Sequence, residues 1–313
     1  MTGAVVLAID VGGTSFKGAV IDDAGRTLIA DSAATGGAQG EEAFAVLERF
    51  VAGMIAQASA KNLTVAACGL IAPGMDERSG HVMFSSNLGW RDFPLVPRLI
   101  ATLGLGIVAG HDVRTAGLAE AQLGAAKGFA DSAMAMIGTG IAASLVSGGQ
   151  AVAGAAQMAC ELGHIPVYPG GEACACGQFG CLEAYASASS IARRYHAAGG
   201  SALTAAEIAG RLAHDPLAAR IWDEAVQALS ISLATVTLLL DPAVIVIGGG
   251  LAEANEVLLA PLRVALRQRL AWRAPPPIVK SVLGSRGALL GAAILAFRSL
   301  GSGDAAAGWQ AGA

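Results

Sequence analysis

The chain has 313 residues, of which 54% are hydrophobic, and it carries a formal net charge of −4 at pH 7. This length predicts two domains, because single hydrophobic cores stop growing at roughly 250 to 300 residues. The negative charge excludes nucleic acid as the main partner, since such binding depends on clustered Lys and Arg that neutralise phosphates.

The apolar residues do not predict a membrane-spanning segment. The longest apolar stretch, residues 225–240, includes several Ser, Thr and Gln residues and ends at Asp241–Pro242. It is shorter than the roughly 20 residues that cross a bilayer, so we expect a buried core helix. Asp10 interrupts the apolar start of the chain, which therefore lacks the pattern of a signal peptide. We expect a cytoplasmic protein that does not bind membranes.

The first elements are short apolar segments joined by glycine turns. Residues 4–9 end at Asp10 and the pair Gly12–Gly13, apolar residues resume at 19–21, and residues 23–25 form a second turn. This pattern predicts strand, tight turn, strand, turn, strand.

Helices and buried strands follow. Residues 41–58 carry apolar side chains at three- and four-residue spacing, which predicts an amphipathic helix. Residues 65–72 and 107–109 predict strands, and a helical pattern then runs through Leu123.

The second half repeats the opening pattern. Residues 133–137, the turn Gly138-Thr139-Gly140 and residues 141–146 again predict strand, turn, strand. Residues 243–247 predict a strand that runs into Gly248-Gly249-Gly250. We infer an α/β protein with two related domains that face each other across a cleft.

The end of the chain has two parts. Helical patterns continue through Phe297, and the tail from Gly301 is rich in Gly, Ala and Ser. Such a tail predicts a frayed terminus.

The segment after the first strand has the composition of a phosphate-binding turn. Gly12 and Gly13 allow backbone conformations closed to other residues and let main-chain N–H groups approach an anion. Thr14 adds a hydroxyl, Lys17 adds a positive charge, and Asp10 is placed to orient Mg²⁺ through water. An ordinary hairpin turn is the alternative. The segment lacks both the Walker spacing and the helix that a dinucleotide fingerprint requires.

Two further glycine clusters favour a nucleotide. Gly138-Thr139-Gly140 and Gly248-Gly249-Gly250 each follow directly on an apolar strand. Three such clusters suit a nucleotide held between two domains, with the first two at the phosphates and the third against the adenosine.

Three of the five cysteines fall within eight residues, at Cys174, Cys176 and Cys181, shortly after His164. One His and three Cys make a complete tetrahedral set, which is typical of structural zinc. The glycines between the last two cysteines supply tight turns. In a cytosolic chain this crowding predicts a metal rather than disulfides, and small core thiols beside a satisfied histidine are the alternative.

Two carboxylates lie next to this cluster. Glu161 precedes His164 by three residues, and Glu183 follows Cys181 by two. A metal would hold both near one spot, and His164 can ligate it through one ring nitrogen while offering the other N–H to a substrate. Carboxylates that face hydroxyls are the ordinary way to bind a sugar, whereas solvated surface carboxylates are the alternative.

These motifs resemble those of the ROK family (repressors, open reading frames and sugar kinases). The resemblance runs in order over residues 5–297. It is carried by Asp10-x-Gly-Gly-Thr14, Glu161-x-Gly-His164, Cys174-x-Cys-Gly-x3-Cys181-x-Glu183 and Ile247-Gly-Gly-Gly250.

The resemblance implies the actin-like ATPase fold of hexokinases and a homodimer or homotetramer. The implied N-terminal domain, 1–113, is the smaller and is completed by a C-terminal helix at 286–299. The implied larger domain, 114–285, holds the zinc site, and a disordered tail follows at 300–313.

The activity implied by the resemblance is transfer of a phosphoryl group from ATP to a hexose hydroxyl, with Mg²⁺ at the reaction and Zn²⁺ as a structural ion. Asp112, between a strand and a helix, is the implied general base, although a lone Asp there is more often a helix cap. The implied sugar contacts are Gly74, Asn87, His111, Asp112, Glu161, His164 and Glu183. The implied ATP contacts are Asp10, Gly12, Gly13, Thr14, Lys17, Gly138, Thr139, Gly140, Gly248, Gly249 and Gly250.

The residues beside Asp112 depart from the family pattern. Many members have Asn directly before the base and again two positions after it, where this chain has His111 and Arg114. His111 retains a donor for a sugar hydroxyl. Arg114 either pairs with Asp112 and lowers its pKa or faces solvent.

Three functions compete at this stage. A hexokinase acting on the 6-hydroxyl of glucose is expected, with N-acetylmannosamine, another N-acetylhexosamine, mannose and fructose as alternative acceptors and polyphosphate as an alternative donor. A DNA-binding repressor would need a helix-turn-helix domain ahead of Asp10, where nine residues stand. A non-catalytic sugar sensor is the third interpretation.

Overall fold

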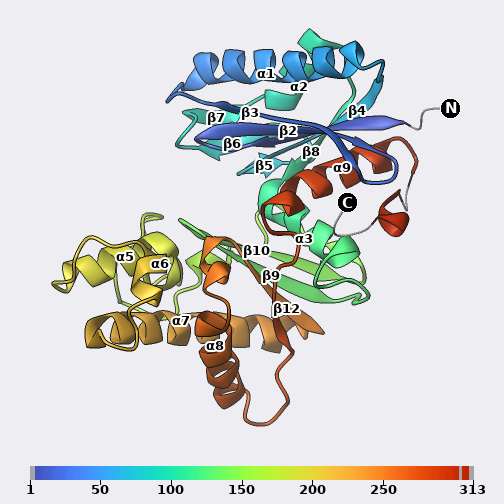
Figure 1. Ribbon diagram of the computed structural model, residues 1–313. Helices are drawn as coiled ribbons and strands as arrows, with labels where there is room; N and C mark the ends of the chain where they lie inside the picture. The colour runs from blue at the N-terminus through green and yellow to red at the C-terminus, as the bar shows by residue number, and fades with distance from the viewer. Residues whose placement is uncertain (1–3, 303–304, 310–313) are drawn as a thin grey trace. The chain divides into compact units, whose positions relative to one another are not determined.

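The computed structural model describes residues 4–302 and 305–309, which fall into two compact units (Figure 1). Unit 1 comprises Met1–Gly124 and Ser285–Ala313, and unit 2 comprises Ala125–Gly284. Each unit has its own five-stranded sheet and its own hydrophobic core.

The sheet of unit 1 has the strand order β3-β2-β1-β4-β8. Its strands are β1 (Val5–Val11), β2 (Ser15–Asp22), β3 (Thr27–Ala34), β4 (Val65–Ala72) and β8 (Ile107–His111). β1 pairs antiparallel with β2 and parallel with β4, which in turn pairs parallel with β8. The carboxyl ends of β1, β4 and β8 therefore meet at one edge of the sheet, where ligands bind in open α/β sheets.

Helices cover both faces of this sheet. α1 (Gly40–Ala60) lies on one face, and α3 (Asp112–Leu123) and α9 (Gly287–Ser299) pack together on the other (Figure 1). A small sheet and one helix complete the unit: β5 (Met75–Asp76), β6 (His81–Ser85), β7 (Trp90–Phe93) and α2 (Leu95–Leu103).

The boundary between the units differs from the expected one at residue 113. All of α3 belongs to unit 1 because it packs closely on α9. Gly291 permits this close packing, since a Cβ at that position would collide with the backbone carbonyl of Thr115.

The sheet of unit 2 has the strand order β11-β10-β9-β12-β13. Its strands are β9 (Ser132–Ile137), β10 (Ile141–Ser147), β11 (Gln150–Ala151), β12 (Val244–Gly248) and β13 (Ile278–Lys280). β9 pairs antiparallel with β10 and parallel with β12, as β1 does with β2 and β4. The repeat seen in the sequence therefore corresponds to a repeated strand arrangement.

Unit 2 carries most of the remaining helices. They are η1 (Leu162–His164), α4 (Glu183–Ala186), α5 (Ala188–Ala197), α6 (Ala205–Ala209), α7 (Pro216–Leu240), η2 (Gly250–Ala254) and α8 (Glu256–Arg269), and η3 (Gly284–Arg286) leads back into unit 1. α7 shows how the sequence sets its own ends. The Asp215 carboxylate accepts hydrogen bonds from the first backbone N–H groups, Pro216 occupies the first helical position, and Asp241 ends the helix in a left-handed conformation.

Two helices, α1 and α7, are long and apolar enough to cross a membrane by length and composition alone. In the structure each helix packs a row of apolar side chains into the core of its own unit. Phe44 and Leu47 of α1 lie in the core of unit 1, and Ile221 and Leu229 of α7 lie in the core of unit 2. Both helices therefore have the contacts of core helices, as predicted for residues 225–240.

The C-terminal tail differs from the sequence prediction. η4 (Ala305–Gly308) leads to Trp309, which is 2% exposed and donates from Nε1 to the Asp23 carbonyl at 2.9 Å. The Trp309 ring also packs edge-on against Phe297. The predicted fraying is wrong for residues 305–309, because one aromatic side chain fixes this segment. The rest of the predicted tail, at 303–304 and 310–313, lies outside the described residues.

Candidate functional site

Two carboxylates lie at the edge of the unit 1 sheet where the parallel strands end. Asp10 is the penultimate residue of β1, and Asp112 follows directly on β8 as the first residue of α3. Burial, and after it the negative charge of Asp112, raises the pKa of Asp10 from 3.8 to about 6, while Lys17 across the β1–β2 ladder acts in the opposite direction. Neighbouring carboxylates of this kind provide oxygen ligands and charge for a hard cation.

Replacement of Asp10 by Asn is expected to stabilise the protein at neutral pH in the absence of Mg²⁺. The folded state binds the Asp10 proton more tightly than the unfolded chain does, so the free energy of unfolding falls as pH rises between about 4 and 6. Above about pH 6 the wild type has lost at most about 3 kcal/mol of its free energy of unfolding through this raised pKa. Urea unfolding should find Asp10→Asn more stable than wild type at about pH 7.5 and nearly equal to it at about pH 4. A variant less stable than wild type at the higher pH contradicts this.

The first glycine turn is built differently from the prediction. Gly12 and Gly13 do not adopt the left-handed backbone conformations that favour glycine, so the expected conformational reason is wrong. Gly13 is required instead for space, because a Cβ there would lie 2.6 Å from Nδ2 of Asn87. The turn and Asn87 are therefore in contact, and Thr14 and Lys17 are exposed beside them in sequence.

The Asp112 carboxylate is held through one of its oxygens. Oδ1 accepts a hydrogen bond from the Val113 backbone N–H at 2.7 Å and lies 3.1 Å from Nδ1 of His111. The Asp112 side chain is 27% exposed, so its carboxylate reaches solvent. Nδ1 of His111 faces Asp112. Nε2 is therefore the ring nitrogen left for the predicted contact with a sugar.

Arg114 does not face solvent, as one of its two predicted alternatives required. Its side chain is 4% exposed, and its Nε donates to Oε1 of Glu77 at 3.0 Å. Arg114 thus pairs with Glu77 rather than with Asp112. Glu77 could not be predicted, because nothing local marks an acidic hairpin residue as the partner of a helical residue 37 positions further on.

The second glycine turn, in unit 2, is held by Glu183 and by helix α5. Oε2 of Glu183 accepts a hydrogen bond from the Ile141 N–H at 2.7 Å, and a Cβ at Gly140 would lie 2.6 Å from the same oxygen. The hydroxyl of Ser189 donates to the Thr139 carbonyl at 2.5 Å. The structure therefore brings Glu183, a predicted sugar contact, together with a predicted phosphate turn.

The third glycine cluster borders a pocket of about 350 Å³ in unit 2. The pocket is mostly apolar, and several of its residues are alanines, which carry no chemical signature in a sequence. It is lined by Ala188, Thr204, Ala205, Ala206, Ala209, Trp222, Gly250, Leu251, Glu253 and Ala254. Of these residues, only Gly250 was predicted as part of a binding site.

The predicted metal ligands converge. One ligand atom from each of His164, Cys174, Cys176 and Cys181 lies within 4.8 Å of all the others. The sulfurs of Cys176 and Cys181 are 3.7 Å apart, and Nδ1 of His164 is 3.8 Å from the sulfur of Cys174. Zinc–sulfur bonds of about 2.3 Å at tetrahedral angles separate two sulfurs by about 3.8 Å, so the residues fit this ion.

The loop between the metal ligands is shaped by glycine. Gly180 has φ +78°, and a Cβ there would collide with the Tyr168 carbonyl. This turn lets the buried sulfur of Cys181 meet that of the exposed Cys176. His164 faces the cluster through Nδ1, which leaves Nε2 for another partner. Glu161, immediately before η1, is exposed.

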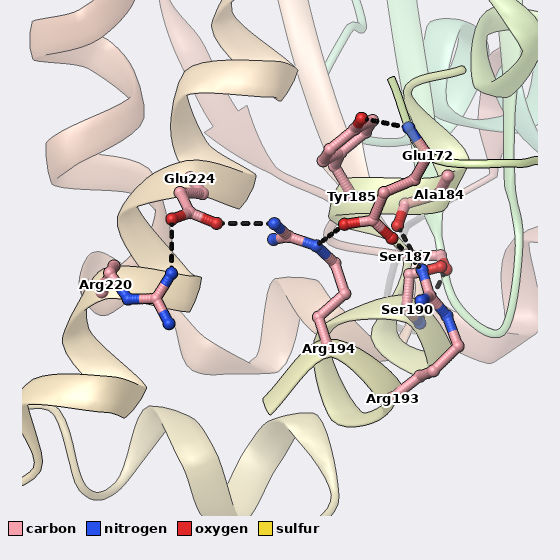
Figure 2. A network of polar contacts seen from close by, with 9 residues as sticks. All are labelled: Glu172, Ala184, Tyr185, Ser187, Ser190, Arg193, Arg194, Arg220 and Glu224. Carbon is pink, nitrogen blue, oxygen red and sulfur yellow. Dashed lines mark hydrogen bonds and ion pairs between the residues drawn. The ribbon is translucent and has the colours of Figure 1, made fainter. Parts of the chain in front are cut away.

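A charged network holds the loop that carries Cys174, Cys176 and Cys181 to the helices of unit 2 (Figure 2). Glu172, two residues before Cys174, accepts hydrogen bonds from Arg193 and Arg194 of α5 at 2.7 and 2.6 Å. Arg194 is 12% exposed and also donates to Glu224 of α7 at 2.6 Å. Through Glu172 the loop is therefore tied to α5, and Arg194 ties α5 in turn to α7. None of these four charged residues was predicted.

Comparison with known proteins agrees with this geometry. Residues 6–299 match the ROK family. A glucokinase from Halalkalibacterium halodurans is 33% identical, over 82% of this chain and 83% of its own. The crystal structure of a ROK hexokinase from Thermus thermophilus has 33% identity and a TM-score of 0.84, with 96% of this chain and 100% of that one covered. A ROK family glucokinase from Streptomyces griseus, in complex with glucose and AMPPNP, has 29% identity and a TM-score of 0.80, with 94% and 100% covered.

These similarities, together with the paired sheets and the Cys/His cluster, define a sugar kinase with the actin-like ATPase fold. The chain belongs to the ROK family. The predicted family and fold are therefore confirmed.

Proposed function

We propose that this sugar kinase transfers the γ-phosphoryl group of ATP to the 6-hydroxyl of glucose, with Asp112 as the general base. The observation that carries the proposal is the Asp112 carboxylate, which is partly exposed at the carboxyl edge of the unit 1 sheet and held through Oδ1. The family's kinases and the glucokinase relative support glucose as the acceptor.

Phosphoryl transfer needs little covalent chemistry from the protein. The attacking hydroxyl must lose its proton, and Oδ2 of Asp112 is the oxygen available to accept it, because Oδ1 already accepts from Val113. The proposed sugar ligands are Gly74, Asn87, His111, Asp112, Glu161, His164 and Glu183.

The nucleotide is proposed to contact all three glycine clusters. The turns at Gly12–Thr14 and Gly138–Gly140 present backbone N–H groups to its phosphates, and Gly248–Gly250 borders the pocket of about 350 Å³, which has room for an adenine. Lys17 adds positive charge, and Asp10 orients Mg²⁺ through water. When bound, Mg²⁺ neutralises charge on the transferring phosphates.

Zn²⁺ is proposed as a structural ion on His164, Cys174, Cys176 and Cys181, whose ligand atoms have the spacing of a tetrahedral set. When bound, it supplies a crosslink between η1 and the cysteine loop. That crosslink keeps Glu161 and Glu183, which flank the ligands in sequence, near one another.

A homodimer or homotetramer in the cytoplasm is also proposed. Apolar side chains at the end of α7 and in the loop after α8 are exposed, and an ion pair between Arg273 and Asp241 brings these two segments together. The exposed residues are Leu238, Leu239, Leu240 and Trp272. Exposed apolar groups of this kind are typical of subunit interfaces.

A panel of sugars tests the proposal most directly. ADP release is measured with ATP and Mg²⁺ for glucose, mannose, fructose, N-acetylglucosamine and N-acetylmannosamine, and glucose should give the largest kcat/KM. A larger value for another sugar corrects the acceptor. Turnover with polyphosphate in place of ATP corrects the donor. If sugars bind but none supports turnover, the non-catalytic sensor replaces the kinase.

A further inference from the structure

One carboxylate oxygen binds both sides of the corner that carries Asp112. Oε1 of Glu77, on the hairpin between β5 and β6, accepts hydrogen bonds from the His111 backbone N–H at 3.0 Å and from Nε of Arg114 at 3.0 Å. His111 immediately precedes Asp112, and Arg114 follows it by two residues. Glu77 therefore connects the end of β8 to the first turn of α3.

The surroundings of Arg114 explain why this carboxylate is needed. Arg114 occupies the first turn of α3, where the helix dipole favours negative charge and opposes a cation. Its side chain is also buried, and a buried guanidinium without an anionic partner is strongly destabilising. Glu77 supplies an anionic partner for it, and at 29% exposure Glu77 is itself only partly desolvated.

We propose that Glu77 is a positioning residue for catalysis, which sets the place of Asp112 through the His111 N–H and the Arg114 guanidinium. The inference rests on the proposed role of Asp112 as the base. Glu77 has no contact with the Asp112 carboxylate among the hydrogen bonds and ion pairs of the described residues, so it acts through its neighbours. It also places the His111 ring, whose Nδ1 lies beside Oδ1 of Asp112.

Replacement of Glu77 should slow the chemical step rather than weaken substrate binding. A displacement of a reacting group by about 1 Å can cost about 100-fold in rate. Glu77→Gln keeps an oxygen that can accept from the His111 N–H but removes the charge opposite Arg114. We expect kcat to fall about 10- to 100-fold, with the KM values for sugar and ATP within about threefold of wild type.

Asp76→Asn is the matched control, because it removes the neighbouring carboxylate on the same hairpin. Asp76 accepts from the Arg78 N–H and the Ser79 hydroxyl at 2.9 Å, both within its own turn. Its kcat should stay within about twofold of wild type. The double variant Glu77→Gln/Arg114→Met should recover part of the kcat lost in Glu77→Gln, since it also removes the cation that loses Glu77 as a partner.

Three results of these rate measurements would overturn the proposal. These are a Glu77→Gln kcat within twofold of wild type, an equal fall in Asp76→Asn, or a rise in KM that accounts for the whole loss of kcat/KM. Amide hydrogen exchange of His111 gives a readout that needs no turnover. Exchange should be at least tenfold faster in Glu77→Ala than in wild type, and unchanged exchange also overturns the proposal. If Asp112→Asn keeps full activity, the base assignment fails separately, and the exchange result still decides whether Glu77 holds the corner.

Discussion

Asp112→Asn is expected to lower kcat by about 100- to 10,000-fold, the range that a positioned general base contributes. The amide has nearly the same shape as the carboxylate, and its oxygen can still accept from the Val113 N–H, so the start of α3 should keep its geometry. The amide cannot take the proton of the attacking hydroxyl. Rates of ADP release at saturating sugar and ATP, together with calorimetric titration of the sugar, measure the two effects separately.

Sugar affinity should stay within about threefold of wild type in Asp112→Asn, because one hydrogen-bonding position is retained. Asp31→Asn serves as the control, since Asp31 is an exposed acid on β3 that bonds Gln57, and it should behave as wild type. Retained turnover in Asp112→Asn would remove Asp112 as the base. Loss of sugar binding together with turnover would instead assign Asp112 to substrate binding.

The second large effect is expected from loss of the metal cluster. Elemental analysis of the purified protein should find about one zinc per chain, as the four converging ligands predict. The double variant Cys174→Ser/Cys176→Ser should retain almost none, because two ligands cannot hold a structural zinc ion. It should also lose several kcal/mol of unfolding free energy, since metal binding at such sites is coupled to folding.

Cys160→Ser is the control for the cysteine variants. The Cys160 thiol lies outside the cluster and bonds the Val152 carbonyl at 3.6 Å, so this variant should keep its zinc. A disulfide would also bring two sulfurs close together. Thiol titration of the unfolded chain with a chelator present tests for one, and it should find all five cysteines reduced. A wild-type protein without zinc, or with a disulfide between Cys176 and Cys181, would contradict the prediction.

Much of the fold could be predicted because its signals are local. The strand predicted at 65–72 coincides with β4, and the apolar spacing of 41–58 lies within α1. The convergence of His164 with the three cysteines was also predictable, since the cysteines lie within eight residues and a short loop cannot place them far apart. In such segments backbone periodicity sets the secondary structure, and covalent spacing keeps nearby side chains together, without any distant contact.

Other features could not be predicted from local patterns. The tail was expected to fray from its Gly/Ala/Ser composition, yet Trp309 donates a hydrogen bond to the carbonyl of Asp23, near the other end of the chain. The expected reason for Gly13 was backbone freedom, whereas the structure requires space for Asn87, which is far away in sequence. In both cases the deciding partner is distant in the chain.

The sequence by itself determined the α/β elements, the glycine turns, the cluster of one His and three Cys, and the family of this protein. Only the tertiary structure decided the partners of the charged side chains. Glu77 meets Arg114, Glu172 meets Arg194, and Glu183 meets a backbone N–H beside the second glycine turn. The physical reason is that helical and strand periodicity act over a few residues. The partner of a buried charge, by contrast, is set by which distant segments the hydrophobic cores bring together, and no local pattern encodes that choice.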